Sequence, residues 1–73
     1  MTKLQKIRKK RGLTQKKLAT LSEISYRTLQ DYEIAHKSID GAKVKTLLKL
    51  CKVLNCELED ILEDEETIKL LKK

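Results

Sequence analysis

The feature that most constrains this chain is a pair of short helical patterns within the twenty residues Thr14–Glu33, separated by a very short break. Each pattern repeats apolar or small residues at helical spacing, so each has one face suited to burial. The inward residues are Leu18, Ala19 and Ser22, and then Ile24, Leu29 and Tyr32. Because the break is too short for anything but a sharp turn, the sequence predicts two helices that cross at a steep angle.

The outward face of the second pattern is polar. It carries Tyr26, Arg27, Gln30 and Asp31, which can donate and accept hydrogen bonds and have no reason to be buried. Two helices joined by a tight turn, with one face of the second left free, form the helix-turn-helix arrangement, and the free face enters the major groove of DNA. The pattern therefore indicates a protein that reads double-stranded DNA.

Charge is distributed unevenly along the chain. Residues 1–37 hold ten Lys and Arg against three Asp and Glu, whereas residues 38–73 hold seven against eight. A basic front half and an acidic tail are typical of one surface that faces a polyanion and another that is turned away from it. A merely solvated surface is the alternative, because basic charge often serves only solubility.

Composition favours a small all-α domain. The chain has 73 residues, no proline and two glycines, which places it near the lower size limit for a self-sufficient core. Cys51 and Cys56 lack metal or redox spacing and are interpreted as reduced core residues of a cytoplasmic protein. His36 has no suitably spaced ligand, so no metal or cofactor is expected. No apolar run is long enough for a membrane span or signal peptide.

Five helices are expected, with a possible short sixth near the C-terminus. The first three cover the ranges Thr2–Lys10, Gln15–Leu21 and Tyr26–Ile34. Gly12 has the backbone freedom that ends a helix. Thr14 and Ser25 have the hydroxyl groups that cap the second and third helices.

The second half of the chain is predicted to hold the remaining helices. Asp40 is expected to cap the fourth and Asn55 to end it. Its inward stripe is Val44, Leu47, Leu48, Cys51 and Leu54. A short fifth helix holds Leu58, Ile61 and Leu62, and Thr67 would cap a last turn. Residues 1–63 are thus expected to form the domain, and residues 64–73 an acidic, amphipathic tail.

Three stretches resemble the Cro/cI-type (XRE-like) helix-turn-helix family of phage-repressor-like regulators. The stretch IRKKRGLTQKKLA resembles the first two helices of the family. SYRTLQDYE resembles its third helix, and VKTLLKLCKVLNCELEDIL resembles its closing helices. The resemblance covers about Lys3 to Leu62 and implies a five-helix, lambda-repressor-like domain that binds operator DNA, usually as a dimer. Glu23 and Ala35 stand where the family usually has glycine.

Candidate DNA-contacting residues fall into two groups. Those expected to reach bases are Gln15, Tyr26, Arg27, Gln30 and Asp31; those expected to reach the backbone are Thr14, Lys16, Lys17, Ser25, Thr28, His36 and Lys37. Arg27 can pair bidentately with guanine and Gln30 with adenine, while Asp31 would either orient Arg27 or accept from cytosine. Lysines supply affinity without sequence information. Gln15 is alternatively an ordinary surface residue, and Thr28 alternatively packs against the second helix.

Two further expectations concern charge and assembly. Glu33 would pair with a basic residue of the first helix, such as Arg8 or Arg11. An apolar set beyond the needs of a small core would form a two-fold homodimer interface: Leu54, Leu58, Ile61, Leu62, Ile68 and Leu71.

The sequence therefore predicts a cytoplasmic transcriptional regulator of prokaryotic or phage type, with repression as the expected role. No enzyme activity is expected, because the chain holds one His, no Gly-rich phosphate loop and no length to spare for a cleft. An antitoxin or a protein-interaction module with the same fold is the alternative. Such a protein would have a toxin or effector as its partner.

Overall fold

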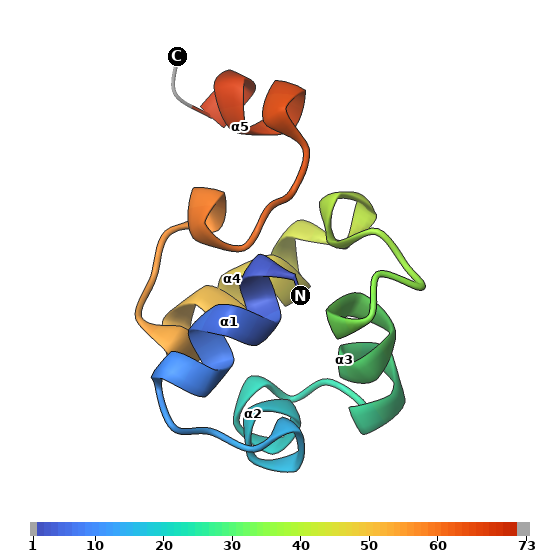
Figure 1. The fold of residues 1–73 in the computed structure, drawn as a ribbon, viewed down its shortest axis with the longest axis vertical. Coiled ribbons are helices and arrows are strands. Elements are labelled where there is room, and N and C mark those ends of the chain that lie inside the picture. The colour runs from blue at the N-terminus through green and yellow to red at the C-terminus, as the bar shows by residue number, and fades with distance from the viewer. Residues whose placement is uncertain (1, 72–73) are drawn as a thin grey trace.

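A computed structural model describes residues 2–71 of the chain, and these form helices joined by short connections, with no strand among them (Figure 1). The elements in chain order are α1 (Lys3–Lys10), α2 (Gln15–Ser22), α3 (Tyr26–Glu33), the 3-10 turn η1 (Ile39–Gly41), α4 (Val44–Leu54), the 3-10 turn η2 (Leu58–Asp60) and α5 (Glu65–Leu71). The predicted all-α fold class is confirmed. Residues 72 and 73 of the predicted tail lie outside the described residues.

Hydroxyl side chains begin the first three helices. Thr2, Thr14 and Ser25 each accept a hydrogen bond from the backbone N–H three residues later, at 3.0–3.2 Å between the two heavy atoms. These bonds satisfy N–H groups that the helices themselves leave unpaired. The caps predicted at Thr14 and Ser25 are confirmed, and Gly12, with a φ of 71°, follows the end of α1 as predicted.

The turn between α2 and α3 is made without glycine. Glu23 ends α2 in the left-handed region at a φ of 58°, and the N–H of Ile24 returns to the carbonyl of Ala19 at 3.1 Å. Ala35, after α3, has a φ of 61°. Left-handed backbone costs a residue with a side chain on the order of 1 kcal/mol. The chain therefore keeps the tight-turn geometry at both positions where it lacks glycine.

α4 differs from the prediction in its start. Lys43 is its N-cap, with no side-chain cap bond, whereas Asp40 lies within η1. The prediction that Asp40 caps α4 is wrong because its carboxylate is used elsewhere: Oδ1 accepts from the backbone N–H groups of Glu63 and Asp64, each at 3.0 Å. Asp40 thus ties the loop after α3 to the segment that leads into α5. The end of α4 is as predicted, with Asn55 left-handed at a φ of 53°.

The inward stripe of α4 is also rotated from the predicted one. Val44 and Leu48, predicted to face inward, are 65% and 53% exposed. The buried stripe keeps helical spacing but begins later, with Leu47, Leu50, Cys51 and Leu54. Because Leu50 is also apolar, α4 has two overlapping apolar faces, the predicted one with Val44 and Leu48 and the observed one with Leu50. The face with Leu50 is the one buried where α4 packs against α2.

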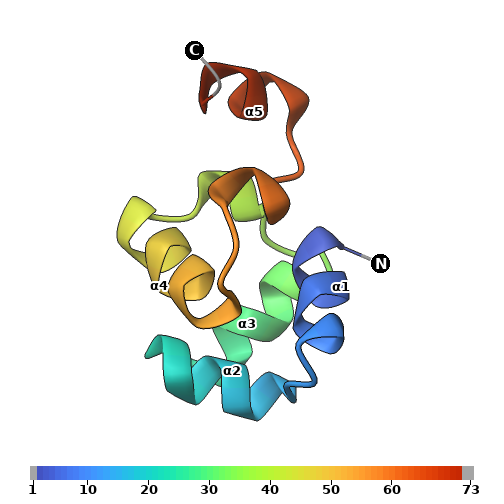
Figure 2. The ribbon, with the colours of Figure 1, turned by 90° about the vertical axis from the view of Figure 1, so that its left-hand side faces the viewer.

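The C-terminal quarter holds two short elements. The predicted fifth helix is reduced to η2, and Ile61 and Leu62, which follow it, are buried in the core. The predicted sixth helix exists as α5. Asp64 starts it instead of Thr67, since Oδ2 of Asp64 accepts from the backbone N–H and the hydroxyl of Thr67. Two perpendicular views place α5 at the end of the molecule farthest from α2 (Figures 1 and 2).

The six residues predicted for a dimer interface do not form an exposed cluster. Leu54, Ile61, Leu62 and Ile68 are all buried within the single chain, with exposed fractions of 0–9%. Leu58 is half-buried against the same core, and Leu71 is exposed. The prediction of an exposed cluster is wrong because a chain this short needs these side chains to close its own core.

Candidate nucleic-acid interface

The outward face of α3 presents Tyr26 and Arg27 to solvent. The Arg27 side chain is 84% exposed, Tyr26 is exposed, and Gln30 is half-buried. A shallow hollow of about 330 Å³ lies beside them, and its lining includes Gln15, Arg27, Gln30, Asp31, Ile34 and His36. The structure therefore brings together the first residue of α2, the outward face of α3 and the loop after it, which carry most of the predicted base contacts.

Asp31 is more buried than the sequence predicts. The residue is only 8% exposed, so the expectation that it has no reason to be buried is wrong. Its Oδ1 lies 3.7 Å from Nε of Arg27, and its Oδ2 lies 3.8 Å from Nζ of Lys37. Of the two roles considered for Asp31, this geometry supports orientation of Arg27, since a covered carboxylate has little surface left for a cytosine.

The backbone around Asp31 also holds the following loop in place. The carbonyl oxygen of Asp31 accepts from the N–H groups of both His36 and Lys37, at 2.9 and 3.2 Å. The left-handed Ala35 turns the chain back to allow this. His36 and Lys37, two predicted backbone contacts, are therefore exposed and fixed next to the end of α3.

A buried ion pair underlies the same region. Nε and Nη2 of Arg8 donate to the two carboxylate oxygens of Glu33, at 2.6 and 3.1 Å, and Glu33 is only 2% exposed. The predicted pairing of Glu33 with α1 is confirmed at Arg8. Arg11, the other candidate, instead donates from Nε to the carbonyl oxygen of Leu54 at 2.7 Å, at the end of α4.

Gln15 joins this ion pair to the surface. Its Nε2 donates to Oε1 of Glu33 at 3.0 Å, and its Oε1 accepts from the hydroxyl of Tyr26 at 3.4 Å. Sequence reasoning missed the bond to Glu33 because the two residues are eighteen positions apart. An amide has two N–H groups, so one donor of Gln15 remains for another partner. The result is a chain of polar contacts that runs from buried Arg8 to exposed Tyr26.

The other predicted backbone contacts lie around the starts of α2 and α3. Lys16 and Lys17 are exposed, and Nζ of Lys16 lies 5.9 Å from the centre of the Tyr26 ring. The Ser25 hydroxyl donates to Oγ1 of Thr28 at 2.7 Å. Thr14 is exposed, with its oxygen engaged in capping α2. These groups flank the outward face of α3 with positive charge and hydroxyls.

The two cysteines have no part in this face. Both thiols are free; Cys51 is buried and Cys56 is half-buried against the core. Burial, with a smaller contribution from neighbouring Cys56, raises the pKa of Cys51 to about 12. Burial also raises the pKa of Cys56. The two free, covered thiols agree with the interpretation of both cysteines as reduced core residues.

No three or more His, Cys, Asp or Glu side chains among residues 2–71 are placed to hold a metal ion. None of the helices described has the length and apolar character needed to cross a membrane.

The chain matches a known family over most of its length. The model of a helix-turn-helix family aligns with residues 4–61, from within α1 to the residue after η2. The match includes the whole α2–α3 unit and leaves α5 outside. No curated protein matches the chain.

Proposed function

The chain belongs to the Cro/cI-type helix-turn-helix family, and we propose that it regulates transcription by reading an operator with α3 in the major groove. The family itself implies binding to DNA, and families of this kind are typically non-enzymatic. The observation that carries the finer proposal is Arg27, whose exposed guanidinium projects from α3 with the Asp31 carboxylate 3.7 Å from its Nε.

Base reading is assigned to the outward residues of α3. Arg27 can form two parallel hydrogen bonds with the O6 and N7 atoms of guanine, and Gln30 can do the same with N6 and N7 of adenine. Tyr26 lies at the exposed start of the helix, where its ring can contact a thymine methyl or its hydroxyl a phosphate. Asp31 acts beneath them by positioning Arg27 and not by touching a base.

Gln15 is assigned to the edge of the reading face. Its oxygen accepts from Tyr26 and one of its N–H groups is bound to Glu33, so what it offers DNA is a single fixed donor. It lies at the first position of α2, where unpaired backbone N–H groups also favour an anion. A phosphate oxygen or a base acceptor would satisfy this donor.

Affinity is assigned to the surrounding groups: Lys16, Lys17, His36 and Lys37, with the hydroxyl groups of Thr14, Ser25 and Thr28 beside them. All seven lie on α2, on α3 or in the segments next to them. Each lysine that neutralises a phosphate releases counterions and adds salt dependence without sequence preference.

The regulator is proposed to act as a homodimer that represses transcription in the cytoplasm of a prokaryotic cell. One domain of this size buries too little DNA surface for tight and selective binding. Two copies on a palindrome would place their α3 helices about 34 Å apart, one turn of B-DNA.

Selection of binding sites from a random pool of duplexes tests this proposal. The expected result is a palindromic consensus bound at least about a thousandfold more tightly than random DNA at physiological salt. Binding that rises equally for all duplexes as salt falls, with no enriched consensus, would contradict sequence-specific reading.

A further inference from the structure

The end of α4 brings together two thiols that the proposed function does not use. Cys51 lies in the last turn of α4, and Cys56 is the second residue after the helix. The left-handed Asn55 reverses the chain between them, and the backbone N–H of Cys56 donates to the carbonyl oxygen of Cys51 at 3.1 Å. The side chains at these two positions of such a helix end commonly contact each other. The fold therefore places two cysteines that are five positions apart in the sequence next to each other.

The two thiols also differ in how far they are covered. The thiol of Cys51 donates a hydrogen bond to the sulfur of Cys56. Cys51 is 8% exposed and belongs to the hydrophobic core, whereas Cys56 is half-buried against that core. A small reagent from solvent therefore meets Cys56 first, with Cys51 in contact behind it.

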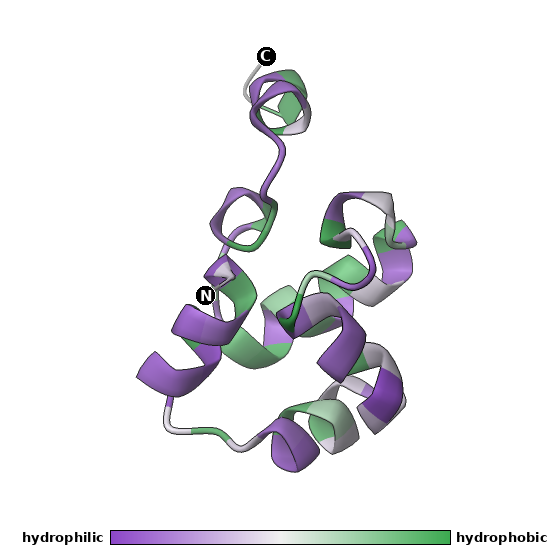
Figure 3. Ribbon diagram, turned by 45° about the vertical axis from the view of Figure 1, so that its right-hand side comes forward, coloured by the Kyte–Doolittle hydropathy of each residue, from purple (hydrophilic) through white to green (hydrophobic). Residues whose placement is uncertain are grey.

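A cation lies next to this pair. Arg11, the residue after α1, donates from Nε to the carbonyl oxygen of Leu54 at 2.7 Å and from Nη2 to that of Asn55 at 3.4 Å. α1 is mostly hydrophilic and α4 is the more hydrophobic of the two helices (Figure 3). Arg11 thus satisfies carbonyl groups that the end of α4 leaves unpaired and adds a positive charge beside Cys56.

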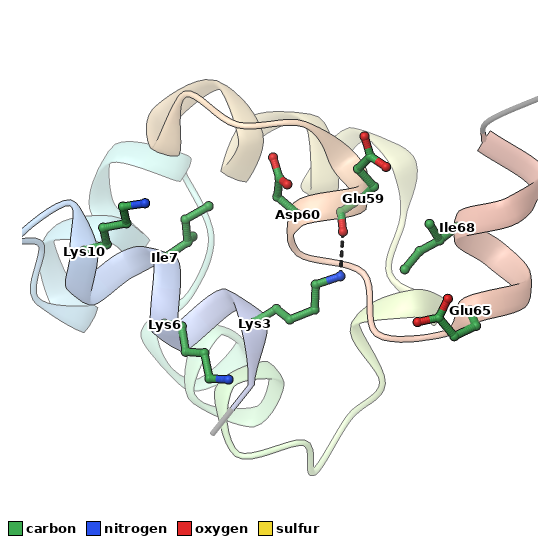
Figure 4. A pocket seen from close by; sticks show the side chains of 8 residues that line it. All are labelled: Lys3, Lys6, Ile7, Lys10, Glu59, Asp60, Glu65 and Ile68. Atoms are coloured by element: carbon green, nitrogen blue, oxygen red, sulfur yellow. Dashed lines mark hydrogen bonds between the residues drawn. The ribbon is translucent and has the colours of Figure 1, made fainter.

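These surroundings affect the two thiols differently. Burial, followed by the influence of Cys56, raises the pKa of Cys51 to about 12, so Cys51 stays protonated at neutral pH. Burial also raises the pKa of Cys56, but the hydrogen bond from Cys51 and the charge of Arg11 act in the opposite direction. Asp60, in the wall of the cleft between η2 and α1 (Figure 4), and Glu57 disfavour both thiolates. Reaction with an oxidant therefore starts at Cys56 and is slow.

We propose that Cys51 and Cys56 form a reversible disulfide when the protein meets a peroxide, which makes the end of α4 an oxidative modification site. The thiolate of Cys56 attacks one oxygen of hydrogen peroxide and becomes a sulfenic acid; the hydroxide released takes up the proton that Cys56 has lost. The sulfur of Cys51 then attacks the sulfur of the sulfenic acid. The S–S bond forms, the S–O bond breaks, and the hydroxyl leaves as water with the proton of Cys51. Two thiols are oxidised and one peroxide is reduced to two molecules of water.

The neighbouring thiol determines the product of the oxidation. An isolated sulfenic acid reacts with further peroxide and passes to sulfinic acid, which thiols do not reduce. Cys51 is already in contact with Cys56 and can trap the sulfenic acid before this happens. The product can then be reduced back to the two thiols. Neither cysteine is among the predicted DNA contacts, so the inference does not rest on the proposed function.

Equilibration of the full chain with glutathione redox buffers tests whether the fold favours this disulfide. The ratio of oxidised to reduced protein gives the effective concentration of the two thiols, in native buffer and again in concentrated urea. The native value should exceed the value in urea by at least about tenfold, because the helix end holds together two thiols that meet only in passing in the unfolded chain. A native value equal to or below the value in urea would overturn the proposal.

Intact mass after treatment with hydrogen peroxide tests the order of the two steps. The wild-type chain should lose two hydrogen atoms and regain them on treatment with dithiothreitol. Cys51→Ala should instead gain oxygen atoms at Cys56 that dithiothreitol does not remove. Cys56→Ala should react at least about tenfold more slowly than the wild type, because its remaining thiol is buried. Circular dichroism confirms that each variant is folded.

Three results of this second experiment would contradict the proposal. A wild-type chain that gains oxygen atoms would show that Cys51 does not trap the sulfenic acid. A disulfide that joins two chains would show that the thiols do not meet within one chain. A folded Cys56→Ala variant that reacts as fast as the wild type would place the first step at Cys51. The glutathione equilibrium uses the wild-type chain alone, so it decides the matter even if a variant fails to fold.

Discussion

The α2–α3 unit and α5 differ in how completely their side chains are satisfied. In the first region even the buried charge is matched: Glu33 receives hydrogen bonds from Arg8 and Gln15, and Gln15 receives one from Tyr26. In α5, one residue is buried, and two leucines and the carboxylates of the first turn face solvent. The buried charge of the first region has its partners within the chain, although the buried Ser22 hydroxyl of α2 has none among residues 2–71. The second region has exposed apolar and acidic groups that a partner could satisfy.

This difference separates two kinds of recognition. A reading face whose side chains are already held in place loses less conformational entropy when it binds. An element with exposed apolar surface gains most of its stability from association. We therefore expect substitutions in the α2–α3 unit to damage folding or reading, and substitutions in α5 to damage assembly.

The largest effect on stability is expected at the buried ion pair between Arg8 and Glu33. Glu33→Ala leaves Arg8 buried without its carboxylate partner, which should lower the free energy of unfolding by about 3–5 kcal/mol. Urea denaturation followed by circular dichroism measures it. The matched double variant Arg8→Met with Glu33→Leu removes both charges and should recover most of this loss. A loss below about 1 kcal/mol in Glu33→Ala would contradict the assignment of a buried, matched pair.

Leucines of the two regions provide the next comparison. Leu29 of α3 is fully buried, so Leu29→Ala should cost about 2–5 kcal/mol of stability through lost apolar burial and a cavity. Leu70→Ala in α5 should change the stability of the monomer by less than about 0.5 kcal/mol. Chemical denaturation at a concentration where the chain is monomeric compares the two. Equal costs would show that α5 is as well packed as α3.

A smaller effect of opposite sign is expected at Ala35. Its φ of 61° is left-handed, which glycine adopts without strain, so Ala35→Gly should stabilise the fold by up to about 1 kcal/mol. The converse change at Gly12, whose φ is 71° and which has open space around it, should destabilise by a similar amount through backbone strain alone. Thermal denaturation of Ala35→Gly and Gly12→Ala checks both signs, and a loss of stability in Ala35→Gly would place the turn in another conformation.

The smallest effects concern single phosphate contacts. Lys16→Ala, Lys17→Ala and Lys37→Ala should each reduce the slope of log K against log salt by about one where the lysine meets a phosphate. Lys69→Ala removes the same charge from α5 and should leave the slope unchanged. Titrations of a selected operator at several salt concentrations measure these slopes. If Lys16→Ala, Lys17→Ala and Lys37→Ala all keep the wild-type slope, the prediction that these lysines contact phosphates is wrong.

Local chemistry made much of the fold predictable. The caps at Thr14 and Ser25 and the left-handed end at Asn55 depend on a few neighbouring residues, and the structure confirms them. The predicted cap at Asp40 is wrong because the carboxylate accepts from backbone N–H groups more than twenty positions away. The predicted burial of Val44 and Leu48 is wrong because α4 has two overlapping apolar stripes. Packing against segments distant in the sequence determines which of the two stripes is buried.

The candidate site was predictable in its residue types and less so in its internal geometry. The exposed position of Arg27 follows from the spacing of the inward residues of α3. The burial of Asp31 does not, since it results from the loop that folds back over it through His36 and Lys37. The bond between Gln15 and Glu33 likewise depends on how α2 crosses α3. Which of these residues touch DNA stays a prediction.

The most direct test of DNA reading by α3 compares Arg27→Ala with Lys69→Ala on the selected operator and on its single-base-pair variants. Both substitutions remove one positive charge, and both side chains belong to exposed residues. The account predicts that Arg27→Ala loses about 1–3 kcal/mol on the preferred operator and tolerates any base pair at one position of each half-site, while Lys69→Ala keeps full discrimination. Unchanged discrimination in a folded Arg27→Ala protein would contradict the placement of α3 in the major groove.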